Sequence, residues 1–182
     1  MGKLIIFPTD TVYGIGCSIF DIDNINKIYE IKHRSKDKPL ACLCASIEQI
    51  ESIAIIKDDA KKLINKFLPG ALTLILNSKD EVINKIGYKT IGVRIPNSKV
   101  ALDILNENGP MLTTSVNDSG MTPLNEYEEI KEKYGNLVDE IYKPNSKSSN
   151  ISSTVVSILN NDVKILREGE ISKEDILKVL ND

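Results

Sequence analysis

The chain has 182 residues, of which 41% are hydrophobic, so it can bury one sizeable core and favours a single domain over residues 1–182. Its formal net charge of −3 at pH 7 argues against a generally basic nucleic-acid-binding surface, so any basic site must be concentrated. The first apolar run ends at Pro8, too early for a signal peptide, and no stretch approaches the roughly 20 apolar residues that span a membrane. We therefore expect a cytoplasmic protein without membrane contact.

Apolar runs typical of strands and apolar residues at helical spacing follow one another along the chain. In chain order the predicted elements are a strand at residues 4–7, a helix at 22–34, a strand at 40–45, helices at 46–55 and 58–67, strands at 71–76 and 90–95, a helix at 98–106, a strand at 111–114, a helix at 125–134, strands at 138–142, 154–159 and 163–166, and a helix from 172. This order predicts an α/β fold with a twisted mixed sheet and packed helices, rather than a regular doubly wound parallel fold.

Three of the predicted helices begin beside residues whose side-chain oxygens can cap free backbone N–H groups. The candidate caps are Asp21 or Asp23, Ser46 with Gln49, and Asn125 with Glu128. The last two pairs have the three-residue spacing of a capping box.

Three polar segments follow or precede predicted strands and are candidates for function. Residues 8–11 carry hydroxyls on both sides of a carboxylate directly after the first strand, and residues 115–123 follow the strand at 111–114. Residues 144–153 are of low complexity and predict a mobile loop that acts as a lid beside the site.

The three cysteines lie in apolar surroundings. Cys42 and Cys44 are two residues apart and would share one face of a strand, so we interpret them and Cys17 as buried thiols. The alternative is half of a zinc site, but His33 is the only histidine and no second cysteine pair exists to complete four ligands.

Arginine is used sparingly, which makes its positions informative. Among 23 basic residues only Arg34, Arg94 and Arg167 are arginines, and each lies at the end of a predicted element. The guanidinium fork binds carboxylate or phosphate with two bonds and keeps its charge. Three unrelated surface arginines are the plain alternative. We predict that the three hold anionic groups of substrates in one shared site.

A cluster of cations surrounds the first of these arginines, at residues 32–38. Such a cluster would bind phosphates, although a charge run alone is usually a solvated face. His33 within it is more simply an exposed spacer than a catalyst.

A series of motifs in this order resembles the YrdC/Sua5 family of threonylcarbamoyl-AMP synthases. The matching segments are P-T-D-T-x-Y-G at residues 8–14, K-x-R at 32–34, P-G-x-L-T-L at 69–74, V-R-x-P at 93–96, S-x-N-x-S-G at 115–120, S-T-V-V at 153–156 and L-R-x-G at 166–169. The resemblance therefore extends from residue 7 to about residue 170, and the early end of the sequence after Arg167 resembles the single-domain form.

The resemblance implies a YrdC-like fold around a concave, positively charged cleft. It also implies a nucleotidyltransferase that joins L-threonine, bicarbonate and ATP into threonylcarbamoyl-adenylate and pyrophosphate, for modification of adenosine 37 in tRNAs reading ANN codons by a downstream transferase complex. No protein nucleophile is required, because positioning and neutralisation of phosphate charge suffice. Mg²⁺ would arrive with ATP, without metal ligands from the protein and without a prosthetic group.

The same resemblance assigns substrate contacts. The residues assigned to ATP are Lys32, Arg34, Lys38, Ser115, Asn117, Thr122 and Arg167. The residues assigned to threonine are Thr11, Tyr13, Arg94, Thr113 and Ser153. For Tyr13 the alternative is a core aromatic.

The sequence departs from the family pattern at three positions. Ser152 replaces a usual Glu, Leu43 replaces a histidine of some members, and Val116 replaces a usual Ala. The loss of the carboxylate at Ser152 puts threonine affinity in doubt.

The segments at residues 90–94 and 167–169 also look similar to YciO-type paralogues. The alternative function is therefore a YciO-like or YrdC-like protein that holds tRNA or double-stranded RNA without adenylate synthesis. The intact K-x-R and S-x-N motifs favour the synthase.

Overall fold

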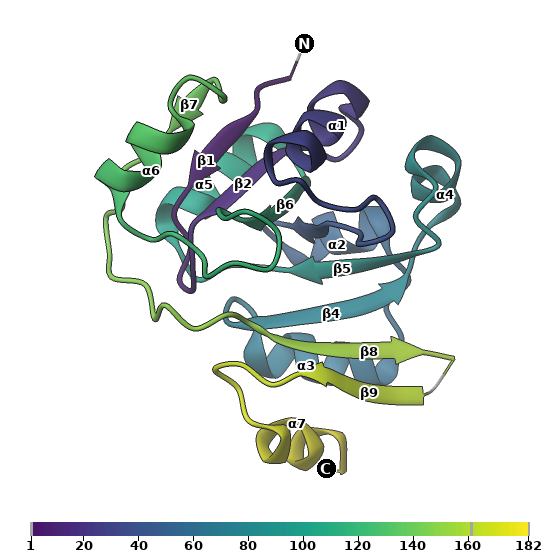
Figure 1. The fold of residues 1–182 in the computed structure, drawn as a ribbon. Helices are drawn as coiled ribbons and strands as arrows, with labels where there is room; N and C mark the ends of the chain where they lie inside the picture. The colour runs from purple at the N-terminus through teal and green to yellow at the C-terminus, as the bar shows by residue number, and fades with distance from the viewer. Residues whose placement is uncertain (1, 161, 182) are drawn as a thin grey trace.

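In the computed structural model, which describes residues 2–160 and 162–181, nine strands form one sheet against which seven helices pack (Figure 1). The strands are β1 (Ile5–Phe7), β2 (Gly14–Ser18), β3 (Ala41–Leu43), β4 (Leu72–Asn77), β5 (Thr90–Arg94), β6 (Met111–Ser115), β7 (Glu140–Ile141), β8 (Thr154–Leu159) and β9 (Asp162–Arg167). The helices are α1 (Ile22–Ile31), α2 (Ile47–Ile53), α3 (Asp58–Phe67), α4 (Asp80–Ile86), α5 (Lys99–Asn108), α6 (Tyr127–Tyr134) and α7 (Lys173–Asn181).

The sheet is mixed, as the sequence predicts. Its strand order is β7-β1-β2-β6-β3-β5-β4-β8-β9. The pairs β1–β7, β3–β5 and β4–β8 are parallel, whereas the other five pairs are antiparallel. The predicted α/β fold with a twisted mixed sheet is confirmed.

Two elements were not predicted from the sequence. Strand β2 has the sequence GIGCS, whose glycines weaken the strand pattern, and α4 is a seven-residue helix between Lys79 and a left-handed Gly87. The first predicted helix is also shorter than expected. It ends at Ile31 because His33 adopts a left-handed backbone conformation with φ of 48°.

The predicted caps differ in outcome. Asp21 accepts a hydrogen bond from the Asn24 backbone N–H at 3.2 Å, and Ser46 caps α2 through the backbone N–H of Gln49. The cap predicted at Asn125 is wrong. Helix α6 has Glu126 at its N-cap without a side-chain bond, since the Asn125 Oδ1 instead accepts from the distant backbone N–H of Tyr13 at 3.0 Å.

Strand register places two rows of side chains on opposite sides of the central sheet. One row crosses six strands and is apolar and buried: Cys17, Leu112, Cys42, Val93, Leu74 and Val156. The neighbouring row consists of small residues paired across four strands: Gly16, Thr113, Ala41 and Gly92. The first row belongs to the core, and the second leaves room for a cavity on the other side.

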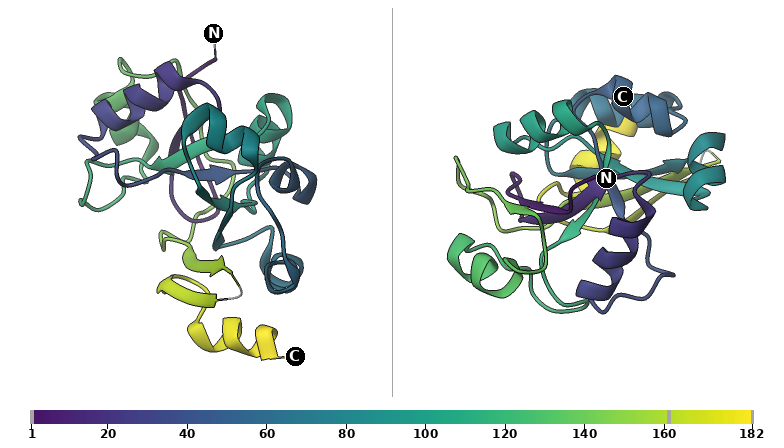
Figure 2. Two further views of the ribbon diagram at one scale, coloured as in Figure 1. Left: turned by 90° about the vertical axis from the view of Figure 1, so that its right-hand side faces the viewer. Right: turned by 90° about the horizontal axis from the view of Figure 1, so that it is seen from above.

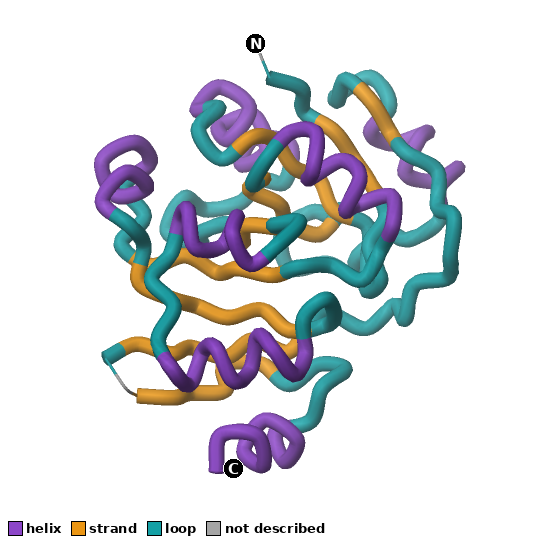
Figure 3. The backbone as a smooth tube through the Cα atoms, turned by 180° about the vertical axis from the view of Figure 1, so that it is seen from behind, coloured by secondary structure: helices purple, strands orange, loops and turns teal. Residues whose placement is uncertain are grey.

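Helices cover the apolar row. Buried side chains of α1, α2 and α3 belong to the same core cluster as this row, and Figure 3 shows α2 and α3 across the strands from behind. A smaller cluster joins α5 to Phe7, Leu43 and Met111. The three cysteines are free and buried, which confirms the prediction of buried thiols, and burial raises the pKa of Cys17 to about 12.

The C-terminal elements lie at one end of the molecule. Figure 2 shows β9 and α7 at the opposite end from α1, and α7 packs against α3. Within residues 2–160 and 162–181, no helix is long and apolar enough to cross a membrane.

Candidate functional site

A cavity of about 410 Å³ opens over the row of small residues. Alternation along the strands lines it with Ala41, Gly92 and Thr113 while their neighbours enter the core. The predicted site residues that line the cavity are Thr11, Tyr13, Arg34, Arg94, Thr113, Ser115, Ser153 and Arg167. All three arginines of the chain therefore meet in one cavity, as predicted, while the ligand of each stays a prediction.

Arg94 is the buried centre of one end of this cavity. The residue is 6% exposed, and its side chain donates from Nε to the Gly70 carbonyl at 2.9 Å, from Nη1 to Thr11 Oγ1 at 2.8 Å and from Nη2 to Asp10 Oδ1 at 2.5 Å. Burial lowers the pKa of Arg94, and the Asp10 carboxylate opposes that effect. Because a guanidinium has five N–H groups, each Nη retains one donor for a ligand.

The loop at residues 8–11 is held by its own hydroxyls. Thr9 Oγ1 donates to the Val12 carbonyl at 2.7 Å, accepts from the Thr11 backbone N–H at 3.2 Å and lies 3.1 Å from Thr11 Oγ1. These bonds fix Thr11 against Arg94 before any ligand binds, so the loop is preorganised.

Arg167 and Gly169 hold the segment that carries Ser153. Arg167 donates from Nε and Nη2 to the Ser153 carbonyl, at 3.2 and 2.9 Å. A Cβ on Gly169 would lie only 2.0 Å from the Ser152 carbonyl oxygen, so a glycine is required for this approach. The L-R-x-G motif thus positions the backbone beside Ser153, and burial lowers the pKa of Arg167.

Lys32 is a buried cation behind the cavity rather than in its lining. Its ammonium donates to the Ser115 carbonyl at 2.5 Å, the Asn117 carbonyl at 2.7 Å and Asn117 Oδ1 at 2.9 Å, and the side chain is 1% exposed. Burial and the nearby Arg34 lower the pKa of Lys32 to about 8, while Asp118 raises it. An ammonium has three N–H groups, and these three oxygens match them.

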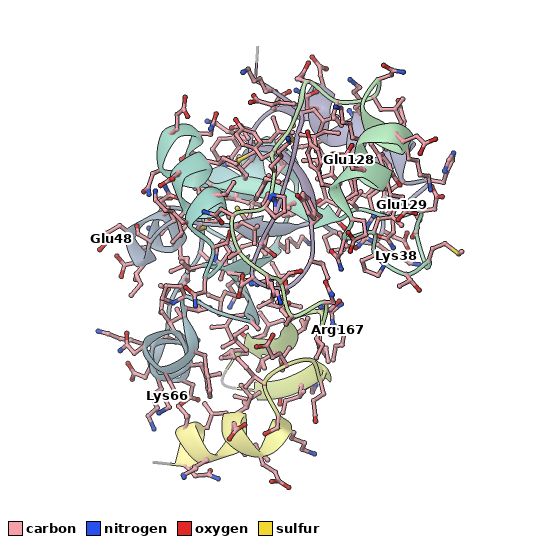
Figure 4. The ribbon with its side chains drawn as sticks, turned by 90° about the vertical axis from the view of Figure 1, so that its left-hand side faces the viewer. Lys38, Glu48, Lys66, Glu128, Glu129 and Arg167 are labelled. Carbon is pink, nitrogen blue, oxygen red and sulfur yellow. The ribbon has the colours of Figure 1, made fainter. Side chains whose placement is uncertain are left out.

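Four residues assigned to ATP therefore lie outside the lining of the cavity: Lys32, Lys38, Asn117 and Thr122. Asn117 is buried in the Lys32 network and accepts from Ser115 Oγ at 2.6 Å, while Thr122 is exposed. Lys38 is exposed, and Figure 4 shows it and Arg167 on the same side of the molecule, away from Glu48 and Lys66. Whether these residues contact ATP stays a prediction.

Arg34 lines the cavity from a loop held by backbone groups. Its Nε donates to the Lys38 carbonyl at 2.9 Å and its Nη2 to the Pro39 carbonyl at 3.2 Å. The neighbouring His33 is exposed, as predicted, and its Nδ1 lies 3.6 Å from Asp118. The guanidinium of Arg34 is thus oriented by main-chain oxygens and keeps three of its five N–H groups.

Tyr13 combines the two interpretations made from the sequence. It is 3% exposed and belongs to the core, yet it also lines the cavity. Its hydroxyl donates to the Tyr142 carbonyl at 3.1 Å, and burial is the main cause that raises its pKa to about 12. The assignment of Tyr13 to threonine stays a prediction.

The predicted lid passes over the loop at residues 8–11. Ser149 and Asn150 donate backbone N–H groups to the carbonyls of Asp10 and Thr11, at 2.9 and 3.0 Å. Ser152 and Ser153 at its end line the cavity. The segment therefore lies beside the cavity, as a lid would, and its motion stays a prediction.

Sequence reasoning did not assign Thr73, Thr90 or Gly14, which also line the cavity. The sequence pattern of β4 could have indicated Thr73. Its leucines Leu72, Leu74 and Leu76 enter the core, so side-chain alternation along the strand directs Thr73 to the opposite face of the sheet, where the cavity lies. The signal for Gly14 was tertiary, since a Cβ there would lie 2.6 Å from Thr113 Cγ2.

The described residues include no group of three His, Cys, Asp or Glu side chains that could hold a metal ion. The cavity instead offers guanidinium groups and hydroxyls, and the Asp10 carboxylate accepts from Arg94 beside it. The guanidinium and hydroxyl donors suit anionic ligands with hydroxyl groups.

The chain is similar to known proteins both in sequence and in structure. The family model described as "Telomere recombination" (Sua5_yciO_yrdC) matches residues 1–169. The threonylcarbamoyl-AMP synthase of Bacillus subtilis is 34% identical over 183 residues, covering 98% of this chain and 53% of that protein.

Two solved structures are also similar. The structure of Pyrococcus abyssi Sua5 complexed with L-threonine matches with a TM-score of 0.88 and 33% identity, covering 97% of this chain and 53% of that chain. Escherichia coli YciO matches with a TM-score of 0.86 and 27% identity, covering 96% of this chain and 87% of that chain. The chain thus spans about half the length of the B. subtilis and P. abyssi proteins.

Proposed function

Because the chain belongs to the Sua5/YciO/YrdC family, we propose that it is an L-threonylcarbamoyladenylate synthase. It makes threonylcarbamoyl-AMP and pyrophosphate from L-threonine, bicarbonate and ATP. Threonine's amine and bicarbonate form a carbamate with loss of water, and the carbamate oxygen attacks the α-phosphate and expels pyrophosphate. The product supplies the tRNA threonylcarbamoyl transferase complex that modifies adenosine 37 in tRNAs reading ANN codons.

The observation that carries this proposal is the meeting of three arginines with several hydroxyls in one cavity. A reaction that joins an amino acid to a nucleotide must bind a carboxylate and a phosphate chain side by side. Guanidinium forks suit both anions.

At one end of the cavity, Arg94 binds the carboxylate of threonine with the donors that its protein partners leave free. Thr11, Thr113 and Ser153 surround the amino acid with hydroxyls. Asp10 and Thr11 hold the Arg94 guanidinium in place, so this side chain is already ordered before threonine binds.

Arg34 and Arg167 bind ATP and neutralise its phosphates, and Ser115 contributes a hydroxyl. Arg34 lies at the nucleotide end, whereas Arg167 lies between the two substrates because it also donates to Ser153. Catalysis then consists of positioning the carbamate for in-line attack and stabilising charge on the phosphate oxygens. No protein nucleophile takes part.

Mg²⁺ would enter this cavity as part of a complex with ATP. Among the described residues no carboxylate cluster could hold the ion by itself, so phosphate oxygens and water would be its main ligands. When bound, the ion neutralises phosphate charge, while Arg34 and Arg167 orient the phosphate chain.

The direct test is pyrophosphate release from ATP, measured with threonine and bicarbonate present, and with each omitted. Release should require both, and mass spectrometry should detect threonylcarbamoyl-AMP. Turnover that is equal without threonine would contradict the proposal.

The similarity to YciO fits the second candidate raised from the sequence, a YciO-like protein that uses the cavity to bind tRNA or double-stranded RNA without adenylate synthesis. Binding to RNA would weaken steeply as salt rises, because phosphate contacts release counterions. ATP held by a few guanidinium bonds should depend only modestly on salt. Tight, salt-sensitive RNA binding without threonine-dependent pyrophosphate release would favour this candidate.

A further inference from the structure

Thr73 has no assigned role, yet it holds the side chain of Ser153 in the cavity. Both residues are buried, at 7% and 6% exposure, and Thr73 Oγ1 lies 2.8 Å from Ser153 Oγ. Within the described part of the chain, Thr73 Oγ1 has no other hydrogen-bond partner. Leu74 pairs with Val93 in antiparallel register, so Thr73 lies opposite the position of Arg94.

The shape of Thr73 fixes the direction of its hydroxyl. Its methyl carbon lies 3.4 Å from the position that a Cβ on Gly92 would occupy, so the methyl group packs over this glycine. A β-branched side chain has few χ1 rotamers. With the methyl group over Gly92, the hydroxyl of Thr73 is directed at Ser153.

The partners of Ser153 determine where the protons lie. Arg167 Nη2 reaches Ser153 Oγ at 3.4 Å, and an arginine can only donate. Either hydroxyl could be the donor in this pair. Donation by Thr73 is favoured, because if Ser153 donated, the Thr73 proton would have no protein acceptor among the described residues. With Thr73 as the donor, both acceptor positions of Ser153 Oγ are filled.

From this geometry we infer that Thr73 is a positioning residue, which makes Ser153 a hydrogen-bond donor aimed at a carboxylate oxygen of the amino-acid substrate beside Arg94. Ser153 has one proton, and with its acceptor positions occupied that proton is free for the cavity. Arg94 also has only donors to offer. A carboxylate can accept from both, whereas an ammonium group cannot. This inference rests on the proposed synthase function.

The test is a double-mutant cycle with Thr73→Val, Ser153→Ala and the combined variant. Valine preserves the shape and β-branching of threonine and replaces the hydroxyl with a methyl group. Each single change should raise the KM for threonine about tenfold, the expected effect of one buried hydrogen bond, and the KM for ATP should change less than about twofold. If Thr73 acts through Ser153, adding Thr73→Val to Ser153→Ala should have no further effect.

Thr73→Ser is the rescue variant, because it restores the hydroxyl and should bring the KM for threonine to within about threefold of the wild type. Thr73→Ala, which removes the hydroxyl without adding volume, should behave as Thr73→Val. Effects of the two single changes that multiply in the combined variant, or an equal rise in the KM for ATP, would overturn the inference alone. Absence of threonine-dependent turnover in the wild type would instead overturn the proposed function together with it.

Discussion

Arg94 and Lys32 are both buried cations that organise a loop, but they use their donors differently. Arg94 gives three bonds to the loops around Asp10, Thr11 and Gly70 and keeps two N–H groups toward the cavity. Lys32 gives its donors to three oxygens of Ser115 and Asn117 and keeps none. The first loop therefore remains able to receive an anion, whereas the second is closed around its own cation.

This difference changes how the K-x-R motif is understood. The charge of Lys32 stabilises the turn at residues 115–117 from behind, and the turn presents Ser115 to the cavity. Arg34, two residues later, lies in the lining and has donors free for a ligand. The two cations of one short motif thus divide into one that holds protein and one that faces the ligand.

The largest effect is expected from Arg94→Lys. Lysine keeps the charge opposite Asp10 but cannot reproduce the bonds to Thr11 and Gly70 while holding a carboxylate, so the KM for threonine should rise by about 100-fold. The KM for ATP should change much less. Steady-state pyrophosphate release with each substrate varied measures both constants, and a thermal unfolding scan reports whether the variant is folded.

Arg34→Lys is the matched control, because it makes the same chemical change in the same cavity at the nucleotide end. It should raise the KM for ATP and leave the KM for threonine almost unchanged. If either variant affects the other substrate more strongly, the division of the cavity into a carboxylate end and a phosphate end is wrong.

Lys32→Met should reduce stability before it changes chemistry. Methionine fills a similar volume but removes the ammonium donor from three oxygens, of which Asn117 Oδ1 keeps its bond from Ser115 Oγ, so the free energy of unfolding should fall by about 3 kcal/mol. Urea denaturation followed by circular dichroism measures this loss. Lys36→Met is the control, since Lys36 is exposed and its removal should cost less than about 0.5 kcal/mol.

The same pair of variants tests whether Lys32 contacts ATP. A wild-type free energy of unfolding for Lys32→Met together with a large loss of ATP affinity would mean that the ammonium binds phosphate. A stability loss accompanied by weaker ATP binding agrees with a role in holding the loop.

The sequence predicted the elements well where one local pattern decided them. Residues 58–67 and 154–159 were predicted with the bounds that α3 and β8 have, because their apolar spacing and flanking residues agree. Strand β2 was missed because its glycines make room for Thr113, a residue about 100 positions away in the chain. Local propensity contains no information on such an approach.

The site was predictable in part of its membership but not in its bonding. The rarity of arginine and the motifs around each arginine together predicted that Arg34, Arg94 and Arg167 share one site, and all three line the cavity. The spacing K-x-R is the same whether a lysine faces a ligand or is buried, and its partner Asn117 lies 85 residues away. Burial of the Lys32 ammonium depends on that distant turn, so the structure was needed to see it.

The smallest effect is expected from Asn125→Ala, which tests the connection between the two loops. Tyr13 donates its backbone N–H to Asn125 Oδ1, and its carbonyl accepts from Val116, so Tyr13 joins the segment after residue 11 to the turn that Lys32 holds. Loss of one partly buried hydrogen bond should lower the free energy of unfolding by about 1 kcal/mol. Urea denaturation measures this change, and the helical circular dichroism signal should stay unchanged because Asn125 does not cap α6.

Both KM values of the Asn125→Ala variant should shift together by about twofold if the two ends of the cavity are coupled through Tyr13. A shift in only one of them would show that the two loops bind their substrates independently.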